Sequence, residues 1–328
     1  MSSKADVAKL YPTTRRGYNI NVTEILLKYS FLIIFLILLV YLSFATPKFL
    51  TVSNVVNVLR QVSYQGIIAV GMTMILILGQ IDMSIGSIVA FAAVVNALLL
   101  KSDVSIPVSI IVTLAISGLW GLLNGYVMAR FRLHAFLVTL ATMTLIRGVT
   151  YTLTSGYPVG GLPEGFFAIG SGQIGFIPLP IIYMFVIFAI GIFVLSSTTF
   201  GRSIYAIGGN EDAARLSGIN VMRVKISVFV VCAVVSAISG LVLSSRLMAG
   251  SPEIGIGWEL DVIAAVIIGG ASLYGGEGKL SGTFLGVLFI GVLTNGMVLL
   301  DVTPYMQMVV RGLVILCAVI FNSLKEKK

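Results

Sequence analysis

The segment Gly275 to Lys279, GGEGK, is the part of the chain that most resembles a nucleotide-binding motif. A phosphate-binding loop has the pattern GxxxxGK[ST], in which backbone N–H groups and the lysine bind phosphates. Here Leu273 occupies the position of the first glycine, five residues before Gly278, and Leu280 follows Lys279 where Ser or Thr is required. The sequence therefore predicts no ATP binding in this chain. Any ATP-driven activity would need an ATPase on another chain.

Histidine and cysteine are too few to build a metal or redox site. The chain has one histidine, His134, and two cysteines, Cys232 and Cys317, both inside apolar stretches. Neither a cluster of metal ligands, nor a disulfide framework, nor a Ser-His-Asp triad with a spare base can be assembled from them. We expect no metal, no catalytic residue and no enzymatic activity in this chain by itself. His134, beside Arg130 and Arg132, is interpreted as a residue of an interfacial loop.

Asp82 is a carboxylate between two long apolar runs, within the sequence QIDMSIG. An ionisable group in such a position is costly and by default functional. Ser84 and Gly86 follow it, a pattern that suits a helix N-terminus. Three interpretations stay open: an N-cap at a broken helix, a direct contact with a polar permeant, and a proton-coupling acid.

Arg311 lies inside the last apolar run, in MQMVVRGLVIL. A guanidinium cannot easily face lipid, so it has to pair with an acid or line a polar cavity. The acids considered as partners are Asp82, Asp261 and Asp301. The sequence does not choose among them, nor between a structural ion pair and a contact with a permeant.

Amides and hydroxyls also occur within the apolar runs. Asn124 and Asn295 are candidates for a translocation path, and further polar side chains in the runs are Gln65, Thr139, Thr142 and Thr144. A path for a neutral hydroxylated solute would use such groups and needs no fixed charge. Hydrogen bonding between helices is the alternative for each of them.

The largest polar island of the chain, Phe200 to Lys225, has the pattern of a loop, a short capped helix and a stop. Two glycines break the chain, an Asn can cap a helix, two acids suit its first turn, and a glycine ends it. These residues are Gly208, Gly209, Asn210, Glu211, Asp212 and Gly218. A short capped helix between apolar runs is typical of a docking element.

Membrane-spanning helices must position these residues, because the composition excludes a water-soluble fold. Hydrophobic residues make up 58% of the chain and charged residues 10%, with a mean hydropathy of +1.06. A soluble domain has about 25% charged residues. The 328 residues allow many spans but leave no room for a large soluble domain.

Ten apolar runs predict an all-α polytopic membrane protein with about ten transmembrane helices. The runs are 29–46, 62–80, 84–100, 107–129, 135–153, 179–198, 226–245, 260–274, 281–300 and 304–322. Residues 1–28 and 323–328 would be tails, and residues 29–322 the transmembrane domain, with the polar loop at about 199–225. The stretch 49–61 is too polar to span and is predicted to lie along the interface.

The distribution of cations predicts that both termini are cytoplasmic. Ten spans place fifteen of the 21 lysines and arginines on the side of the N-terminus. These are Lys4, Lys9, Arg15, Arg16, Lys28, Arg130, Arg132, Arg202, Arg215, Arg223, Lys225, Lys279, Lys325, Lys327 and Lys328. Cytoplasmic loops carry the excess of basic residues, so topology explains the net charge of +8 and no nucleic-acid partner is expected.

From the first apolar run to the C-terminus the chain resembles the monosaccharide (ribose-type) permeases of ABC transporters. The matching segments are AVGMTMILILGQIDMSIGS (69–87), LIRGVTY (145–151), GRSIYAIGGNEDAARLSGINV (201–221), WELDVIAAVIIGGASLYGGEGKLSGT (258–283) and YMQMVVRGLVIL (305–316). Gln80 departs from the glycine expected before Ile81 and Asp82.

The resemblance implies the permease subunit of an importer that moves a monosaccharide, ribose or a similar sugar, across the bacterial inner membrane. Its expected partners are a second copy of the permease, a cytoplasmic ATPase and an extracytoplasmic sugar-binding protein. ATP and Mg would be bound by the ATPase, and this chain would hold no cofactor. The residues that match the family's ATPase-contact pattern are Gly209, Asn210, Glu211, Ala213, Ala214, Gly218 and Ile219.

Two other functions are compatible with a polytopic membrane protein. A secondary transporter would need an essential intramembrane acid and would work without a partner. A membrane receptor or scaffold would not need polar residues within its spans.

Overall fold

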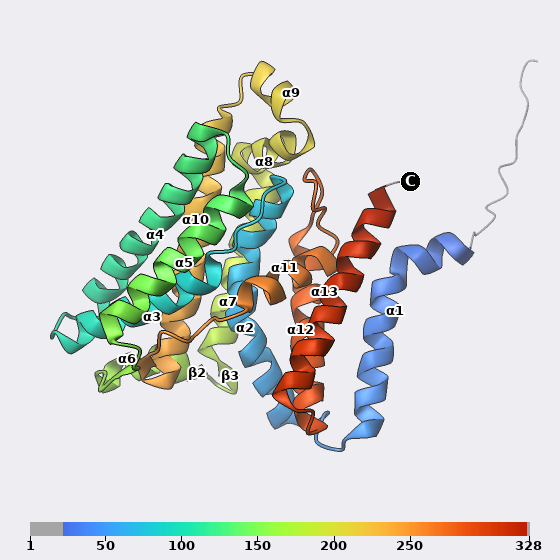
Figure 1. The fold of residues 1–328 in the computed structure, drawn as a ribbon. Coiled ribbons are helices and arrows are strands. Elements are labelled where there is room, and N and C mark those ends of the chain that lie inside the picture. The colour runs from blue at the N-terminus through green and yellow to red at the C-terminus, as the bar shows by residue number, and fades with distance from the viewer. Residues whose placement is uncertain (1–21, 327–328) are drawn as a thin grey trace, which may run out of the picture. The chain divides into compact units, whose positions relative to one another are not determined.

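The computed structural model describes residues 22–326, and most of these are helical (Figure 1). The chain divides into two compact units after Tyr41, and helix α1 (Val22–Ala45) crosses that division. Most of the expected tail 1–28 lies outside the described residues, as do the last two residues of the expected tail 323–328. The predicted all-α class is confirmed.

The second unit is built from helices of unequal length. They are α2 (Val52–Ile77), α3 (Ile85–Lys101), α4 (Ile106–Phe131), α5 (Ala135–Thr154), α6 (Glu164–Ser171), α7 (Leu179–Ser197), α8 (Thr199–Gly209), α9 (Glu211–Leu216), α10 (Val221–Leu247), α11 (Trp258–Ile268), α12 (Leu280–Leu299) and α13 (Pro304–Glu326). Two antiparallel pairs of two-residue strands join the loops: β1 (Val159–Gly160) with β4 (Ala249–Gly250), and β2 (Gln173–Ile174) with β3 (Ile177–Pro178).

Five of the described helices, α4, α5, α7, α10 and α12, are long and apolar enough to cross a bilayer. Shorter apolar helical segments occupy Phe31–Ala45, Ile85–Lys101 and Pro304–Ile320. The count of ten spans therefore stays a prediction.

Three expected segments differ from the structure. The expected span 260–274 is the 11-residue helix α11, about 16 Å long, which is half of the hydrocarbon thickness of a bilayer. It ends at Ile268 because Gly269 follows as C-cap and Gly270 adopts a φ of 94°. The stretch 49–61, expected to lie along the interface, continues from Val52 into α2 as one helix, and the expected loop before Asn210 is helix α8.

Helix α10 forms the centre of the core and packs against α2, α3 and α4. Close approach depends on glycines: a Cβ on Gly121 or Gly125 of α4 would overlap the backbone of α10 at Phe229 or Ile226. On α12, Gly286 likewise lies against the Ala265 carbonyl of α11. These glycines therefore serve the packing of helices within this chain.

Candidate functional site

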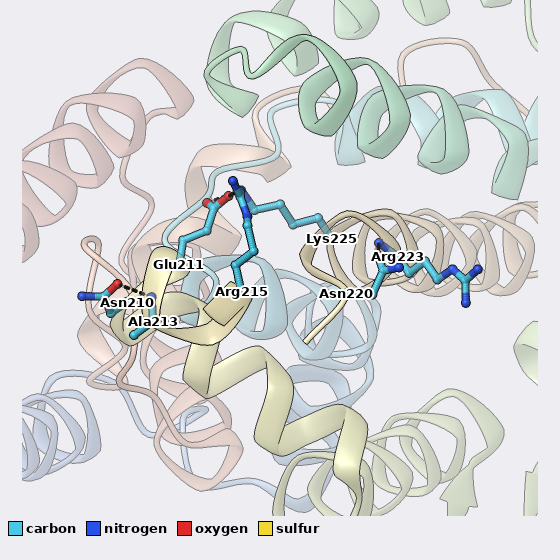
Figure 2. A network of polar contacts seen from close by, with 7 residues as sticks. All are labelled: Asn210, Glu211, Ala213, Arg215, Asn220, Arg223 and Lys225. Carbon is cyan, nitrogen blue, oxygen red and sulfur yellow. Dashed lines mark hydrogen bonds and ion pairs between the residues drawn. The ribbon is translucent and has the colours of Figure 1, made fainter. Parts of the chain in front are cut away.

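Helices α8, α9 and α10 follow one another with single short connections, and a side chain caps the start of each. Thr198 Oγ1 accepts a hydrogen bond from Gly201 N at 3.1 Å at the start of α8. Asn210 Oδ1 accepts from Ala213 N at 2.9 Å, and Asn220 Oδ1 accepts from Arg223 N at 3.1 Å (Figure 2). These caps bond N–H groups that would otherwise have no partner in the helices.

Glu211, in the first turn of α9, holds that helix against α10. Its Oε1 accepts from Arg215 Nη2 at 2.8 Å, and its Oε2 accepts from Lys225 Nζ at 2.6 Å (Figure 2). Burial raises the pKa of Glu211, but Lys225 and Arg215 outweigh it and hold the pKa below its usual value. Glu211 therefore orients α9 within the chain, and the neighbouring acid Asp212 is the exposed one.

The chain leaves α9 through a left-handed residue, Gly218, which has a φ of 84°. Ile219 N donates to Ala214 O at 3.1 Å and Gly218 N to Arg215 O at 3.1 Å, so the last turn is closed by backbone bonds. Within α9, the side chain of Ala214 is buried, whereas that of Ala213 is exposed.

Leu216 at the end of α9 is a residue that sequence reasoning missed. It is 91% exposed although it is a large apolar side chain beside charged residues. The one signal in the sequence is that Leu216 is the single leucine within the polar island Phe200 to Lys225.

Helix α8 connects this region to the body of the protein. A Cβ on Gly208 would overlap the Ile77 carbonyl oxygen at the end of α2, so the two backbones are in direct contact. Gly276 N donates to that same carbonyl at 2.8 Å, and Tyr205 OH of α8 donates to Gly278 O at 2.7 Å. A displacement of α9 would therefore reach the end of α2 and the loop that joins α11 to α12.

A pocket of about 780 Å³ opens beside α9. It lies between α9, the start of α10 and the α4–α5 connection, and it is bordered by charged side chains of both signs. These side chains are Arg130, Arg132, Glu211, Asp212, Arg215 and Lys225, with His134 and Gln80. The pocket therefore brings together four of the fifteen cations that the sequence predicts to be cytoplasmic.

Of the candidate path residues, Asp82 and Asn124 are brought together and fully buried. Asp82 Oδ1 accepts from Ser84 N at 2.8 Å and from Ser84 Oγ at 2.6 Å, and Asn124 Nδ2 donates to Ser84 Oγ at 3.0 Å. The segment between α2 and α3 is thus a helix break, and Asp82 bonds the N-terminal end of α3 through Ser84. Asp82 Oδ2 and Asn124 Oδ1 have no hydrogen-bond partner among the described residues.

Asn295 and Arg311 lie in other parts of the bundle. Asn295 exchanges two amide hydrogen bonds with Asn54 of α2, at 2.9 and 3.0 Å, which is an interhelical pair. Arg311 Nη1 contacts Asp261 Oδ2 at 3.4 Å, so Asp261 is its partner among the three acids considered. Gln65 Nε2 donates to the same oxygen at 3.2 Å.

The second intramembrane arginine, Arg147 on α5, has backbone partners. Its Nη1 donates to Pro252 O at 2.6 Å and to Ile254 O at 3.0 Å, in the non-helical segment before α11. The sequence analysis did not find this role of Arg147. The contact joins Arg147 to a non-helical segment that lies far away in the chain, and no local sequence pattern indicates such a pairing.

Comparison with known proteins identifies the family. Residues 54–319 match the family described as "Branched-chain amino acid transport system / permease component". The chain is 42% identical to the ribose import permease protein RbsC of Haemophilus influenzae, over 94% of this chain and 98% of that protein. It is 44% identical to RbsC of Bacillus subtilis, over 88% and 91% of the two chains. It is 41% identical to the L-arabinose transport system permease protein AraH of Escherichia coli, over 92% of each.

No solved structure matches the chain. The relatives cover it almost from end to end, and its long apolar helices fit a multi-pass membrane protein. The chain therefore belongs to this family of transport-system permease components.

Proposed function

We propose that this chain is the permease subunit of an ATP-driven importer for a monosaccharide, ribose or a closely similar sugar. The observation that carries the proposal is its identity of 41–44% to ribose and L-arabinose permeases over about nine-tenths of its length. The permease works as a homodimer in the inner membrane, with a separate cytoplasmic ATPase and an extracytoplasmic sugar-binding protein. Both termini and α9 lie on the cytoplasmic side.

Helix α9 is the element that docks on the ATPase. It is short, it protrudes beyond α10, and it exposes Asp212, Ala213 and Leu216, whereas Glu211 holds its orientation from within. The contact of Gly208 with Ile77 supports a rigid transfer of movement from α9 to α2. Gly209, Asn210, Ala214 and Ile219 act by shaping this helix rather than by reaching the partner.

Uptake of radiolabelled D-ribose tests the function. The permease is expressed with an ATPase and a sugar-binding protein of a ribose importer, in cells that lack their own ribose and arabinose importers. We expect accumulation that disappears when the ATPase is left out. Accumulation driven by the permease alone would identify a secondary transporter instead, with Asp82 as the first acid to examine.

Co-purification of the ATPase tests the docking of α9. Glu211→Lys should weaken docking because it breaks both ion pairs of α9 and places a cation among Arg215 and Lys225. Gly218→Val should weaken it because a β-branched residue does not tolerate the left-handed backbone. Normal co-purification and normal sugar-stimulated ATP hydrolysis with both variants would mean that α9 is only a connector.

A further inference from the structure

Helix α11 begins in the interior of the bundle, beside α2, α12 and α13 (Figure 1). The Ala265 carbonyl of α11 touches Gly286 of α12, and Gly269 touches Gly282 near the start of α12. Because α11 has only 11 residues and runs antiparallel to the 20-residue α12, its first turn reaches about the midpoint of that helix. The first turn of α11, with Trp258 and Asp261, therefore lies deep in the membrane domain.

Arg311 is incompletely bonded at this depth. It is about 10 Å along α13 from the first residue of that helix. A guanidinium has five N–H donors, and the bond to Asp261 at 3.4 Å is the one side-chain hydrogen bond it makes among the described residues. Its Nε is buried without a partner, while 33% of the side chain is exposed. Lipid cannot accept hydrogen bonds from the remaining donors, so a polar occupant has to meet them.

Asp261, together with Gln65, fixes the position of the Arg311 side chain and leaves most of its N–H donors without a partner among the described residues. Asp261 is 8% exposed, and the oxygen that contacts Arg311 also accepts a hydrogen bond from Gln65. Within the stretch from Val62 to Leu78, Gln65 is the one residue that is not buried. The polar side chains of α2, α11 and α13 thus meet at the one place along this stretch where α2 is not fully buried.

An aromatic side chain completes the arrangement. Trp258 is half-buried and stands three residues before Asp261, so both lie on the same face of α11. Asp261 binds Arg311, so the backbone of Trp258 lies about 5 Å along α11 from the residue that holds the guanidinium. An apolar ring face beside fixed hydrogen-bond donors suits a sugar, because a sugar ring has C–H faces and hydroxyl acceptors.

We propose that Trp258 and Arg311 form the solute-contact site of the permease, with Arg311 donating to sugar hydroxyls and Trp258 packing against the sugar ring. Asp261 and Gln65 are positioning residues that hold the guanidinium. The inference rests on the proposed function, because it takes the solute to be a neutral monosaccharide. The site binds the sugar weakly, since one arginine and one indole supply few contacts to a solute that must be released.

Substrate discrimination is the property that tests the site. The wild-type complex of permease, ATPase and sugar-binding protein is reconstituted in vesicles, and uptake of D-ribose is compared with uptake of 2-deoxy-D-ribose. Arg311→Lys keeps the charge but loses the forked donors. We expect it to lower D-ribose uptake about tenfold, the equivalent of one charged hydrogen bond, and to reduce the preference for D-ribose over its deoxy analogue. Trp258→Leu should lower the uptake of both sugars, and Trp258→Phe should restore it.

The matched control is Arg147→Lys, on an arginine whose bonds go to the backbone at Pro252 and Ile254. It should lower folded yield and uptake of both sugars by the same factor, as a structural loss does. If Arg311→Lys also left the ratio of D-ribose uptake to 2-deoxy-D-ribose uptake unchanged, the contact site would be overturned and Arg311 would be assigned to structure. If that variant lost the dimer, Arg311 would be assigned to assembly, and the contact site would likewise be overturned. Failure of the wild-type complex to import either sugar would overturn the substrate class itself, and the inference with it.

Discussion

The partners of Glu211 lie 4 and 14 residues away in the chain, whereas those of Asp261 lie 50 and 196 residues away. Each acid accepts from two side chains, but the first does so at one end of the bundle and the second inside the membrane domain. Local partners make α9 an element whose shape depends on residues close to it in the chain. Distant partners make the surroundings of Asp261 depend on how α2, α11 and α13 pack. A change in that packing would alter the contact between Asp261 and Arg311.

The largest expected effect comes from breaking the contact between Gly208 of α8 and Ile77 of α2, which joins the end of the bundle that carries α9 to the membrane domain. Gly208→Val would force a branched side chain into the Ile77 carbonyl oxygen, against backbone that cannot move aside. We expect destabilisation of about 3 kcal/mol, the upper part of the range for overpacked sites, seen as lower folded yield and a lower melting temperature in detergent. Gly209→Ala is the control, because a Cβ there meets no atom within 4 Å. Equal melting of the two variants would mean that α8 is not fixed to α2.

The next effect concerns the buried carboxylate. Asp82→Ala removes the acceptor for both Ser84 N and Ser84 Oγ, and both groups stay buried. We expect a loss of about 2 kcal/mol, the cost of buried donors left without an acceptor. Asp82→Asn keeps one acceptor oxygen and should cost less than half as much. Melting curves of the two purified variants check the order, and a larger loss for the Asn variant would indicate that the negative charge itself is required.

The contrast between local and distant partners also explains which features could be predicted from the sequence. The caps and the stop of α9 were predicted correctly, because Asn210, the two acids and Gly218 act within a few residues of each other. The three candidate partners of Arg311 could not be ranked, because the choice of Asp261 depends on the packing of α13 against α11. The short length of α11 was missed for a related reason: an apolar run shows that a segment is buried, but Gly269 and Gly270 decide where the helix ends.

A smaller effect is expected at the cap of α9. Asn210→Ala removes the acceptor of Ala213 N and should cost the local helix about 1 kcal/mol. Because α9 has six residues and little buried surface, the loss should appear as faster hydrogen exchange within α9, with the melting temperature of the whole protein unchanged. Asn210→Asp keeps a capping oxygen and should exchange like the wild type. Uniformly faster exchange across α10 in the Ala variant would show that α9 is not an independent element.

The smallest effect is a pH dependence that belongs to Glu211. Its pKa is lower in the folded protein than in the unfolded chain, because Lys225 and Arg215 outweigh burial. The ion pairs therefore contribute stability above the unfolded pKa, and this contribution is lost as the pH falls through the folded pKa. Since 39% of the Glu211 side chain is exposed, we expect the ion pairs to contribute less than about 1 kcal/mol to stability.

Hydrogen exchange in α9, corrected for its intrinsic pH dependence, should accelerate below the usual titration range of glutamate. Glu211→Gln should exchange faster at neutral pH and lose that step, while Arg130, Arg132, His134 and Asp212 around the pocket are unchanged. A step that persists in the Gln variant would have to come from another group, and the assignment of Glu211 as the residue that holds α9 against α10 would then fail.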